Sequence, residues 1–328
     1  MLPEPIATEP NPVCYLCGQP GAVLYPRLTD RLFGAPGEWT LKRCPSPSCG
    51  LVWLDPRPTA ADIGKAYQTY YTHDHAGHRQ LTRMARIARG LLHPLSVILL
   101  GLRQERRRYK RIYLDQTLPG RLLEAGCGNG KRLARMQKSG WLVAGQEVDP
   151  LAADHVRQKY GIAVHLGPLE TIDAAEPYDA IIMSHVIEHV HDPLAMLQTC
   201  HRLLKKDGVI VLLTPNTASY GHRTFAADWR GLEPPRHLHL FNSTTLTQLA
   251  GKAGFGGVQT WTTPVGAYGI GQSSRSAAEL ADTAQLNTGR ITVRDVLRGF
   301  RFQVAASLRF RFDKNSGEEC VLIAKKIS

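Results

Sequence analysis

Residues 122–130 read Leu-Leu-Glu-Ala-Gly-Cys-Gly-Asn-Gly, an apolar run that ends in three closely spaced glycines. A helix-forming run from Lys131 to Lys138 follows, so this stretch predicts the first strand, turn and helix of a nucleotide-binding α/β domain. Glycine suits such a turn because a ligand can approach its backbone closely and because it adopts positive φ without strain. Glu147, 21 residues after Gly126, suits the two hydroxyls of a ribose. The segment therefore predicts a cofactor that contains adenosine.

Strand and helix patterns alternate after this turn in the order expected for one parallel sheet. The run Val209–Leu213 is apolar at every position, which is typical of a strand buried on both faces. We expect further strands at 141–147, 162–166, 178–183, 257–263 and 319–325, and further helices at 150–160, 193–204 and 243–253. The pattern predicts one doubly wound domain.

The N-terminal part carries two cysteine pairs, Cys14 with Cys17 and Cys44 with Cys49. Four thiolates on two tight turns can complete a tetrahedral zinc site. Four residues separate the second pair instead of two, which lengthens that turn without preventing coordination. Zinc there would mainly supply folding energy to a small unit. The alternative is a set of unrelated free thiols.

Several segments besides the glycine turn carry a family resemblance. They are residues 145–150, 178–180, 185–193, 203–208, 214–216, 234–238 and 317–324. Together with residues 122–130 they resemble class I S-adenosylmethionine-dependent methyltransferases, particularly the ubiquinone-type and the surface-glycan or lipid-modifying enzymes. The resemblance covers most of residues 110–265 and the final strand. It implies S-adenosylmethionine as the methyl donor, and zinc ribbons recur ahead of the methyltransferase domain in this family.

Carried over position by position, the resemblance assigns the glycine turn to the methionine and ribose portions of the cofactor. Glu147 would take the ribose hydroxyls, and Ser184 with His185 would line the methionyl side. The backbone of Leu169 would meet the adenine, because Pro168 stands where the family often has an acidic residue. The expected cofactor-binding residues are Glu124, Gly126, Cys127, Gly128, Gly130, Glu147, Leu169 and Ser184.

Four side chains are candidate catalytic groups: His185, Glu188, His189 and His237. Methyl transfer is an in-line displacement that depends on alignment, and a histidine base helps when the nucleophile is a hydroxyl. The first three lie at i, i+3 and i+4 at the start of an expected helix, which would direct them into the crevice beyond the strands. Alternatively, they hold a divalent metal at the acceptor site, form the inverted zinc-protease motif H-x-x-E-H, or only hydrogen-bond the strand-helix junction.

The net charge of +12 is concentrated in two inserts. Residues 79–111 carry a net charge of +9, and residues 290–314 carry +5. Both inserts are also apolar, but the run 87–102 has sixteen residues, short of the roughly 20 that cross a bilayer. Apolar helices flanked by arginines suit the interface of an anionic membrane. The alternatives are a helical lid or dimer contact, and a nucleic-acid surface, which the aliphatic run fits poorly.

These patterns predict an α/β fold with a Rossmann-like, doubly wound, mostly parallel seven-stranded sheet, a small N-terminal zinc ribbon and a helical lid. The predicted parts are a zinc-ribbon-like module (1–58), a basic apolar helical segment (59–115), the S-adenosylmethionine-binding core (116–265), a basic insert or lid (266–316) and the final core strand (317–328).

The predicted function is S-adenosylmethionine-dependent methyl transfer to a small-molecule, glycan or lipid-linked acceptor, with O-methylation favoured. A NAD-dependent oxidoreductase with the same glycine turn and a non-catalytic zinc-ribbon adaptor are the alternatives. Seven cysteines, four of them with metal-like spacing, and no signal-peptide pattern predict the cytoplasm, with peripheral attachment to the inner membrane face. Nucleic acid is not expected as a partner. The acceptor atom and the oligomeric state have no sequence code.

Overall fold

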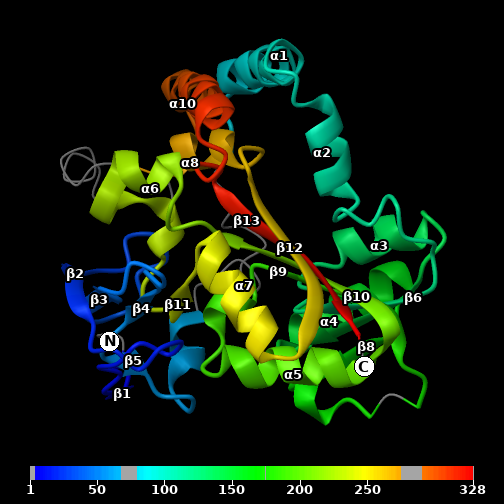
Figure 1. The fold of residues 1–328 in the computed structure, drawn as a ribbon. Coiled ribbons are helices and arrows are strands. Elements are labelled where there is room, and N and C mark those ends of the chain that lie inside the picture. The colour runs from blue at the N-terminus through cyan, green and yellow to red at the C-terminus, as the bar shows by residue number, and fades with distance from the viewer. Residues whose placement is uncertain (1–3, 68–79, 174, 275–289, 328) are drawn as a thin grey trace. The chain divides into compact units, whose positions relative to one another are not determined.

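The computed structural model describes residues 4–67, 80–173, 175–274 and 290–327 (Figure 1). Parts of the two basic inserts, including Arg79 and residues 275–289, lie outside the described residues.

A seven-stranded sheet confirms the predicted fold class. In spatial order its strands are β12 (Phe255–Thr263), β13 (Glu319–Lys326), β10 (Leu204–Pro215), β9 (Tyr178–Ser184), β6 (Arg121–Ala125), β7 (Leu142–Glu147) and β8 (Val164–Leu166). Strands β10, β9, β6, β7 and β8 are parallel to their neighbours in this row. The chain runs from β6 to β7 and β8 and then returns to β9 on the other side of β6. The topological switch, where doubly wound sheets bind ligands, therefore lies at β6 and β9.

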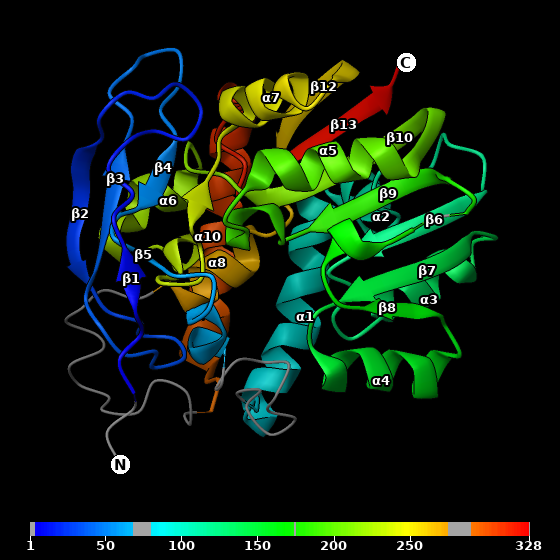
Figure 2. The same ribbon diagram turned by 90° about the horizontal axis from the view of Figure 1, so that it is seen from below.

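Helices connect these strands as the sequence predicts. They are α3 (Lys131–Gln137), α4 (Pro150–Tyr160), α5 (Pro193–Leu203) and α7 (Ser243–Lys252), with short 3-10 helices at η2 (Leu169–Thr171) and η3 (Ile187–His189). Helix α3 contacts β7, α4 contacts β7 and β8, and α5 lies beside α7 (Figures 1 and 2). Right-handed crossovers place α3 and α4 on one face of the sheet and α5 and α7 on the other.

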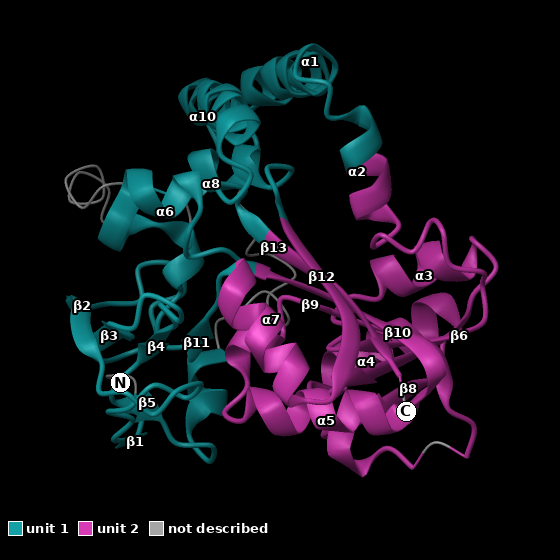
Figure 3. Cartoon of the chain, in the orientation of Figure 1, with its two compact units in different colours: residues 1–105, 215–242, 262–319 teal, residues 106–214, 243–261, 320–328 magenta. Residues whose placement is uncertain are grey.

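The described chain forms two compact units, each assembled from three segments (Figure 3). Unit 1 contains residues 1–105, 215–242 and 262–319, and unit 2 contains residues 106–214, 243–261 and 320–328. Unit 2 holds most of the seven-stranded sheet and its helices. The five-part division predicted from the sequence stays a prediction about folding units.

Unit 1 is built on a four-stranded antiparallel sheet that carries the cysteine pairs. Its order is β11 (His239–Leu240), β4 (Val52–Leu54), β3 (Trp39–Arg43) and β2 (Ala22–Leu28), and β1 (Thr8–Glu9) pairs separately with β5 (Arg57–Pro58). Strand β11 comes from far downstream in the chain, and sequence analysis did not predict it. Buried Trp39 and Leu54 pack with Leu238 and Leu240 in one apolar cluster. The ribbon sheet and the segment around residues 238–240 therefore share one core.

The described part of unit 1 also contains several helices. They are η1 (Ile63–Tyr67), α1 (Arg83–Leu99), α6 (Tyr220–Phe225), η4 (Ala226–Asp228), η5 (Arg230–Leu232), α8 (Ala267–Ser273) and α10 (Val293–Phe312), while α2 (Arg103–Lys110) crosses the boundary between the units. Helices α1 and α10 begin together, because Leu81 and Ile291 form a parallel bridge. Thr82 caps α1, and Thr292 with Asp295 forms a capping box at α10.

Helix α1 covers most of the predicted apolar run. Pro94 lies within it, and a proline in a helix interior removes one backbone hydrogen bond. Across the described ranges no single helix is long and apolar enough to cross a membrane. Helices α1 and α2 meet that criterion only when taken together across a bend of 106°.

Candidate functional site

The predicted glycine turn follows β6, at the carboxyl end of the strand. Gly126, Gly128 and Gly130 all have left-handed φ, at 63°, 50° and 68°. A Cβ on Gly126 would lie 2.5 Å from Val186 and a Cβ on Gly130 2.7 Å from Val156, so packing excludes side chains at both positions. A Cβ on Gly128 would meet no described atom within 4 Å. The backbone of Gly128 is therefore the part of the turn that a ligand can approach.

Glu147 ends β7, next to this turn. Its Oε2 accepts the backbone N–H of Gly128 at 2.8 Å, and its Oε1 accepts those of Val148 at 2.8 Å and Asp149 at 3.2 Å. The side chain is 8% exposed. Three backbone donors thus fix one carboxylate beside the open glycine backbone, although its predicted contact with ribose stays a prediction.

An arginine links two other predicted cofactor residues. Glu124 is 1% exposed within β6, and its Oε1 pairs with Arg132 Nη1 at 2.6 Å. Arg132 Nη2 donates to Ser184 Oγ at 2.9 Å at the end of β9. Burial raises the pKa of Glu124, and the charge of Arg132 opposes this rise. Sequence analysis missed Arg132, but an acidic residue in a buried strand requires such a partner, and Arg132 lies in the first turn of the next helix.

Gln146 joins the glycine turn to the loop that follows β8. Its Oε1 accepts the N–H of Gly126 at 3.0 Å, and its Nε2 donates to the carbonyl of Gly167 at 2.7 Å. Sequence analysis missed this residue as well. Leu169, at the start of η2, has a fully buried side chain, so its predicted adenine contact would come from its backbone. Burial raises the pKa of Cys127 to about 12, so this residue packs as a neutral thiol.

His185 and Glu188 meet beyond β9, although not through the predicted geometry. The prediction that they begin an α-helix is wrong, because the short helix η3 (Ile187–His189) is of the 3-10 type and His185 has a left-handed φ of 57°. His185 Nδ1 nevertheless lies 3.3 Å from Glu188 Oε1. Glu188 is fully buried, and its Oε2 accepts from Thr214 Oγ1 at 3.0 Å. A buried carboxylate oxygen thus lies within ion-pair distance of one ring nitrogen of a half-exposed histidine.

The other two histidines predicted for catalysis belong to different units. His189 ends η3 in unit 2 and is half-buried. His237 belongs to unit 1, is buried, and its Nδ1 lies 2.8 Å from the carbonyl oxygen of Gly231. Because a carbonyl can only accept, Nδ1 carries the proton and Nε2 of the neutral ring is the acceptor. A shared role for these histidines stays a prediction.

The four predicted zinc ligands come together in unit 1. All four sulfur atoms lie within 4.8 Å of one another, with Cys14 and Cys49 at 3.6 Å and Cys17 and Cys44 at 3.4 Å. Tetrahedral zinc with bonds of about 2.3 Å would place its sulfur ligands about 3.8 Å apart. A glycine with left-handed φ, at 73° and 69°, follows the second cysteine of each pair and turns the chain. The donor set and its spacing fit structural zinc.

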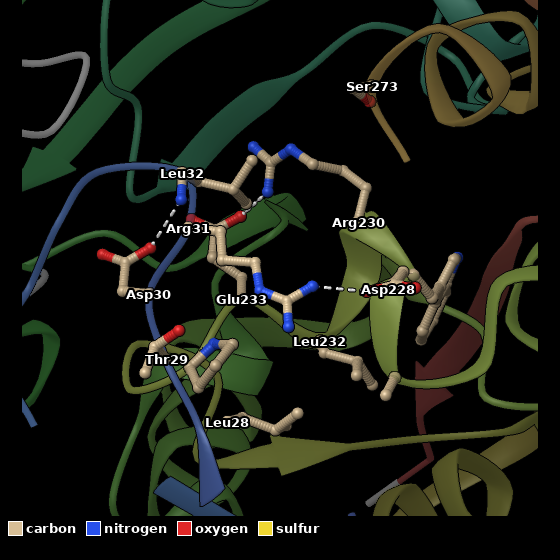
Figure 4. A pocket seen from close by; sticks show the side chains of 13 residues that line it. Leu28, Thr29, Asp30, Arg31, Leu32, Asp228, Arg230, Leu232, Glu233 and Ser273 are labelled. Atoms are coloured by element: carbon tan, nitrogen blue, oxygen red, sulfur yellow. Dashed lines mark hydrogen bonds and ion pairs between the residues drawn. The ribbon is translucent and has the colours of Figure 1, made fainter. Parts of the chain in front are cut away.

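Unit 1 also has a pocket whose charged side chains are paired (Figure 4). Arg31 pairs with Asp228, and Arg230 pairs with Glu233. Fully buried Arg236 also pairs with Glu233, at 3.1 Å. None of the predicted site residues lines this pocket. Its balanced charges indicate a structural ion-pair network.

Comparison with known proteins identifies the class of the α/β core. Residues 102–260 match the family model described as "Methyltransferase domain". This part of the chain, just under half of its length, is therefore similar to S-adenosylmethionine-dependent methyltransferase domains. The matched range begins directly before α2, ends within β12 and includes the glycine turn, Glu147 and the segment around His185.

The relatives share this domain over part of their length. The chain is 31% identical over 163 residues to a "Probable S-adenosylmethionine-dependent methyltransferase" of Mycolicibacterium smegmatis, over 47% of this chain and 62% of that protein. It is 33% identical over 108 residues to the ubiquinone biosynthesis O-methyltransferase of Haemophilus ducreyi, over 29% of this chain and 45% of that protein. A solved SAM-dependent methyltransferase from Archaeoglobus fulgidus is 20% identical with a TM-score of 0.43, over 74% and 98% of the two chains. The chain thus spans less than two thirds of the curated relatives it matches.

Proposed function

We propose that the protein transfers a methyl group from S-adenosylmethionine to a small-molecule, glycan or lipid-linked acceptor, with oxygen as the favoured acceptor atom. The observation that carries this proposal is the 2.8 Å hydrogen bond between Glu147 and the backbone of Gly128. It brings an acid suited to ribose and an open glycine backbone together at the carboxyl ends of β6 and β7. The methyltransferase-domain match supports the reaction type, and the O-methyltransferase relatives support oxygen.

The cofactor would supply the methyl group and an adenosine end for recognition. Glu147 would accept hydrogen bonds from the two ribose hydroxyls, while the glycine turn would lie against the methionine and ribose portions of the cofactor. Arg132 would hold Ser184 in place through its 2.9 Å hydrogen bond, and Glu124 holds Arg132 in turn. Leu169 would contribute its backbone to the adenine.

On the acceptor side, Glu188 is a positioning residue for His185. With the Nδ1 proton directed to the Glu188 carboxylate, Nε2 of the neutral ring is the acceptor nitrogen, and it would take a proton from an acceptor hydroxyl. Removing this proton would raise the nucleophilicity of the oxygen, which would bond to the methyl carbon as the bond from that carbon to the sulfonium sulfur breaks and S-adenosylhomocysteine leaves. His189 and His237 are further candidates for this side. A divalent metal held by Glu188 and His189 is the alternative way to orient an acceptor oxygen.

Isothermal titration calorimetry separates the two enzyme classes. We expect S-adenosylhomocysteine to bind one site per chain and NAD to give no heat of binding, because residues 102–260 match a methyltransferase-domain model. Binding of NAD without S-adenosylhomocysteine would favour an oxidoreductase. Transfer of a labelled methyl group from S-adenosylmethionine into membrane and soluble extracts then separates an enzyme from a non-catalytic adaptor.

We further propose that the protein is cytoplasmic and attaches to the inner membrane face through α1. Apolar side chains along α1 recur at intervals of three and four residues, which places them on one face of the helix. They are Met84, Ile87, Leu91, Leu95 and Ile98, each between 43% and 68% exposed. Arg83, Arg86 and Arg89 are also exposed on the same helix. This combination suits a helix that lies in the headgroup region of an anionic bilayer.

A Leu91→Gln/Ile98→Gln double variant is expected to reduce flotation with phosphatidylglycerol vesicles by at least about tenfold, because two apolar side chains no longer leave water on binding. The matched control, Leu142→Gln/Leu151→Gln, alters two similarly exposed residues of β7 and α4. It should float as the wild type does. Failure of the wild type to float at low salt would refute attachment, and equal losses in both variants would refute the role of α1.

A further inference from the structure

A groove in unit 1 lies between α6 and α10 and encloses about 610 Å³. Three arginines of α10 line it at i, i+4 and i+7, a spacing that places them on one face of the helix. They are Arg294, Arg298 and Arg301. Phe225 of α6 and Leu297 of α10 are among the apolar lining residues. The groove therefore combines positive charge with an apolar wall.

The walls of this groove are held by close packing. Phe302 of α10 stacks on Tyr220 and contacts Phe225, with ring centroids 5.3 Å and 5.1 Å apart. Gly271 of α8 permits close approach of α8 to α10, because a Cβ there would clash with Cβ of Phe302. Gln303 adds a hydrogen bond from its Nε2 to the carbonyl of Pro264 at 3.1 Å. Helices α6, α8 and α10 thus form a fixed support for the lining side chains (Figure 1).

The charge of the groove differs from that of the ion-paired pocket described above. In that pocket Arg31 and Arg230 each pair with a carboxylate. The groove is lined by no carboxylate, and Arg294 and Arg301 form no ion pair with any described residue. Arg294, Arg298 and Arg301 follow one another on successive turns of α10, where like charges repel, so an anion bound among them would relieve the repulsion. Guanidinium groups bind phosphate oxygens through two parallel hydrogen bonds, which favours phosphate among anions.

We propose that the α6/α10 groove binds a lipid phosphate, with the phosphate on Arg294 and Arg301 and the apolar chain along Phe225 and Leu297. The apolar wall selects an anion with an attached hydrocarbon chain over inorganic phosphate, and the arginines select it over a neutral amphiphile. The proposal goes beyond methyl transfer, because all of these residues belong to unit 1 and the binding needs no cofactor.

Calorimetry with dodecyl phosphate below its micelle-forming concentration tests this site. We expect the Arg294→Gln/Arg301→Gln variant to bind at least about tenfold more weakly than the wild type. The matched control is Arg311→Gln, an exposed arginine of α10 that does not line the groove, and it should change the affinity by less than about twofold. Leu297→Gln should weaken binding, whereas Leu308→Gln, an exposed leucine outside the groove lining, should not.

Each of the following outcomes would refute the proposal that the groove binds a lipid phosphate. Equal weakening by Arg311→Gln would indicate general attraction to a basic helix, and unchanged binding by the double variant would place the ligand elsewhere. Equal affinity for inorganic phosphate would show that the apolar wall does not contribute to binding. Equal affinity for neutral dodecyl maltoside would show that the arginines do not contribute. Binding of S-adenosylhomocysteine, measured on the same samples, reports separately on the proposed methyltransferase function, so either result can fail without the other.

Discussion

Replacing Glu147 by alanine is expected to weaken the binding of S-adenosylhomocysteine by at least about 100-fold, because hydrogen bonds to a charged group contribute about 1.5–3 kcal/mol each. The variant would lose the carboxylate that accepts hydrogen bonds from both ribose hydroxyls. It would also remove the partner of the Gly128 N–H and so loosen the turn that contacts the ligand. Isothermal titration calorimetry measures the change directly.

Two further variants serve as controls for the loss of affinity in Glu147→Ala. Asp154→Ala removes an exposed carboxylate from α4 of the same unit and should leave the affinity within about twofold of the wild type, since surface charges act weakly at a distance. His189→Ala should likewise leave binding nearly intact while it lowers the transfer of labelled methyl groups from S-adenosylmethionine. If His189→Ala and Glu147→Ala lowered the affinity equally, the assignment of His189 to the acceptor side would be wrong.

The helices and strands on the cofactor side of the site could be predicted because nearby residues in the sequence, such as caps, prolines and glycines, define where they begin and end. Helix α4 occupies residues 150–160 as predicted, since the Asp149 side chain caps it, Pro150 suits its first turn and Gly161 ends it with a left-handed φ of 64°. The strand predicted at Val209–Leu213 is longer, from Leu204 to Pro215, because Leu204 also pairs with Tyr178 of β9, ahead of a register shift over residues 205–208. Apolar periodicity alone cannot show such an extension.

Features that depend on distant parts of the chain were not predictable in the same way. Strand β11 has two residues, and only its pairing with β4 makes it a strand. The left-handed φ of His185 replaced the expected helix start with a turn, and no glycine marks that position. Arg132 lay within reach of sequence reasoning, because Glu124 in an apolar strand requires a cation. The residues of unit 1 that join the ribbon to residues 215–242 had no such local signal.

Replacing Cys14 by serine is expected to remove bound zinc and to unfold the four-stranded sheet of unit 1. Structural zinc contributes roughly 10–16 kcal/mol in small zinc-binding peptides, which is as large as the whole stability of many domains. The effect should extend to β11, because β4 pairs with β11 and the N–H of Leu54 donates to the carbonyl of Leu238 at 3.1 Å. Elemental analysis would measure the zinc, and hydrogen exchange of peptides 39–54 and 236–242 would measure the sheet.

Ser46→Ala is the matched control, because Ser46 lies within the second cysteine loop and its exposed hydroxyl bonds Ser48 rather than a cysteine. It should keep one zinc per chain and wild-type exchange in both peptides. Treatment of the wild type with a chelator provides a second measurement that does not depend on folding of the variant during expression. Loss of zinc with unchanged exchange at 236–242 would show that the ribbon is energetically separate from the segment that carries His237. Parallel loss of protection in both peptides would instead show that the zinc ligands stabilise a predicted catalytic residue through the β4–β11 pair.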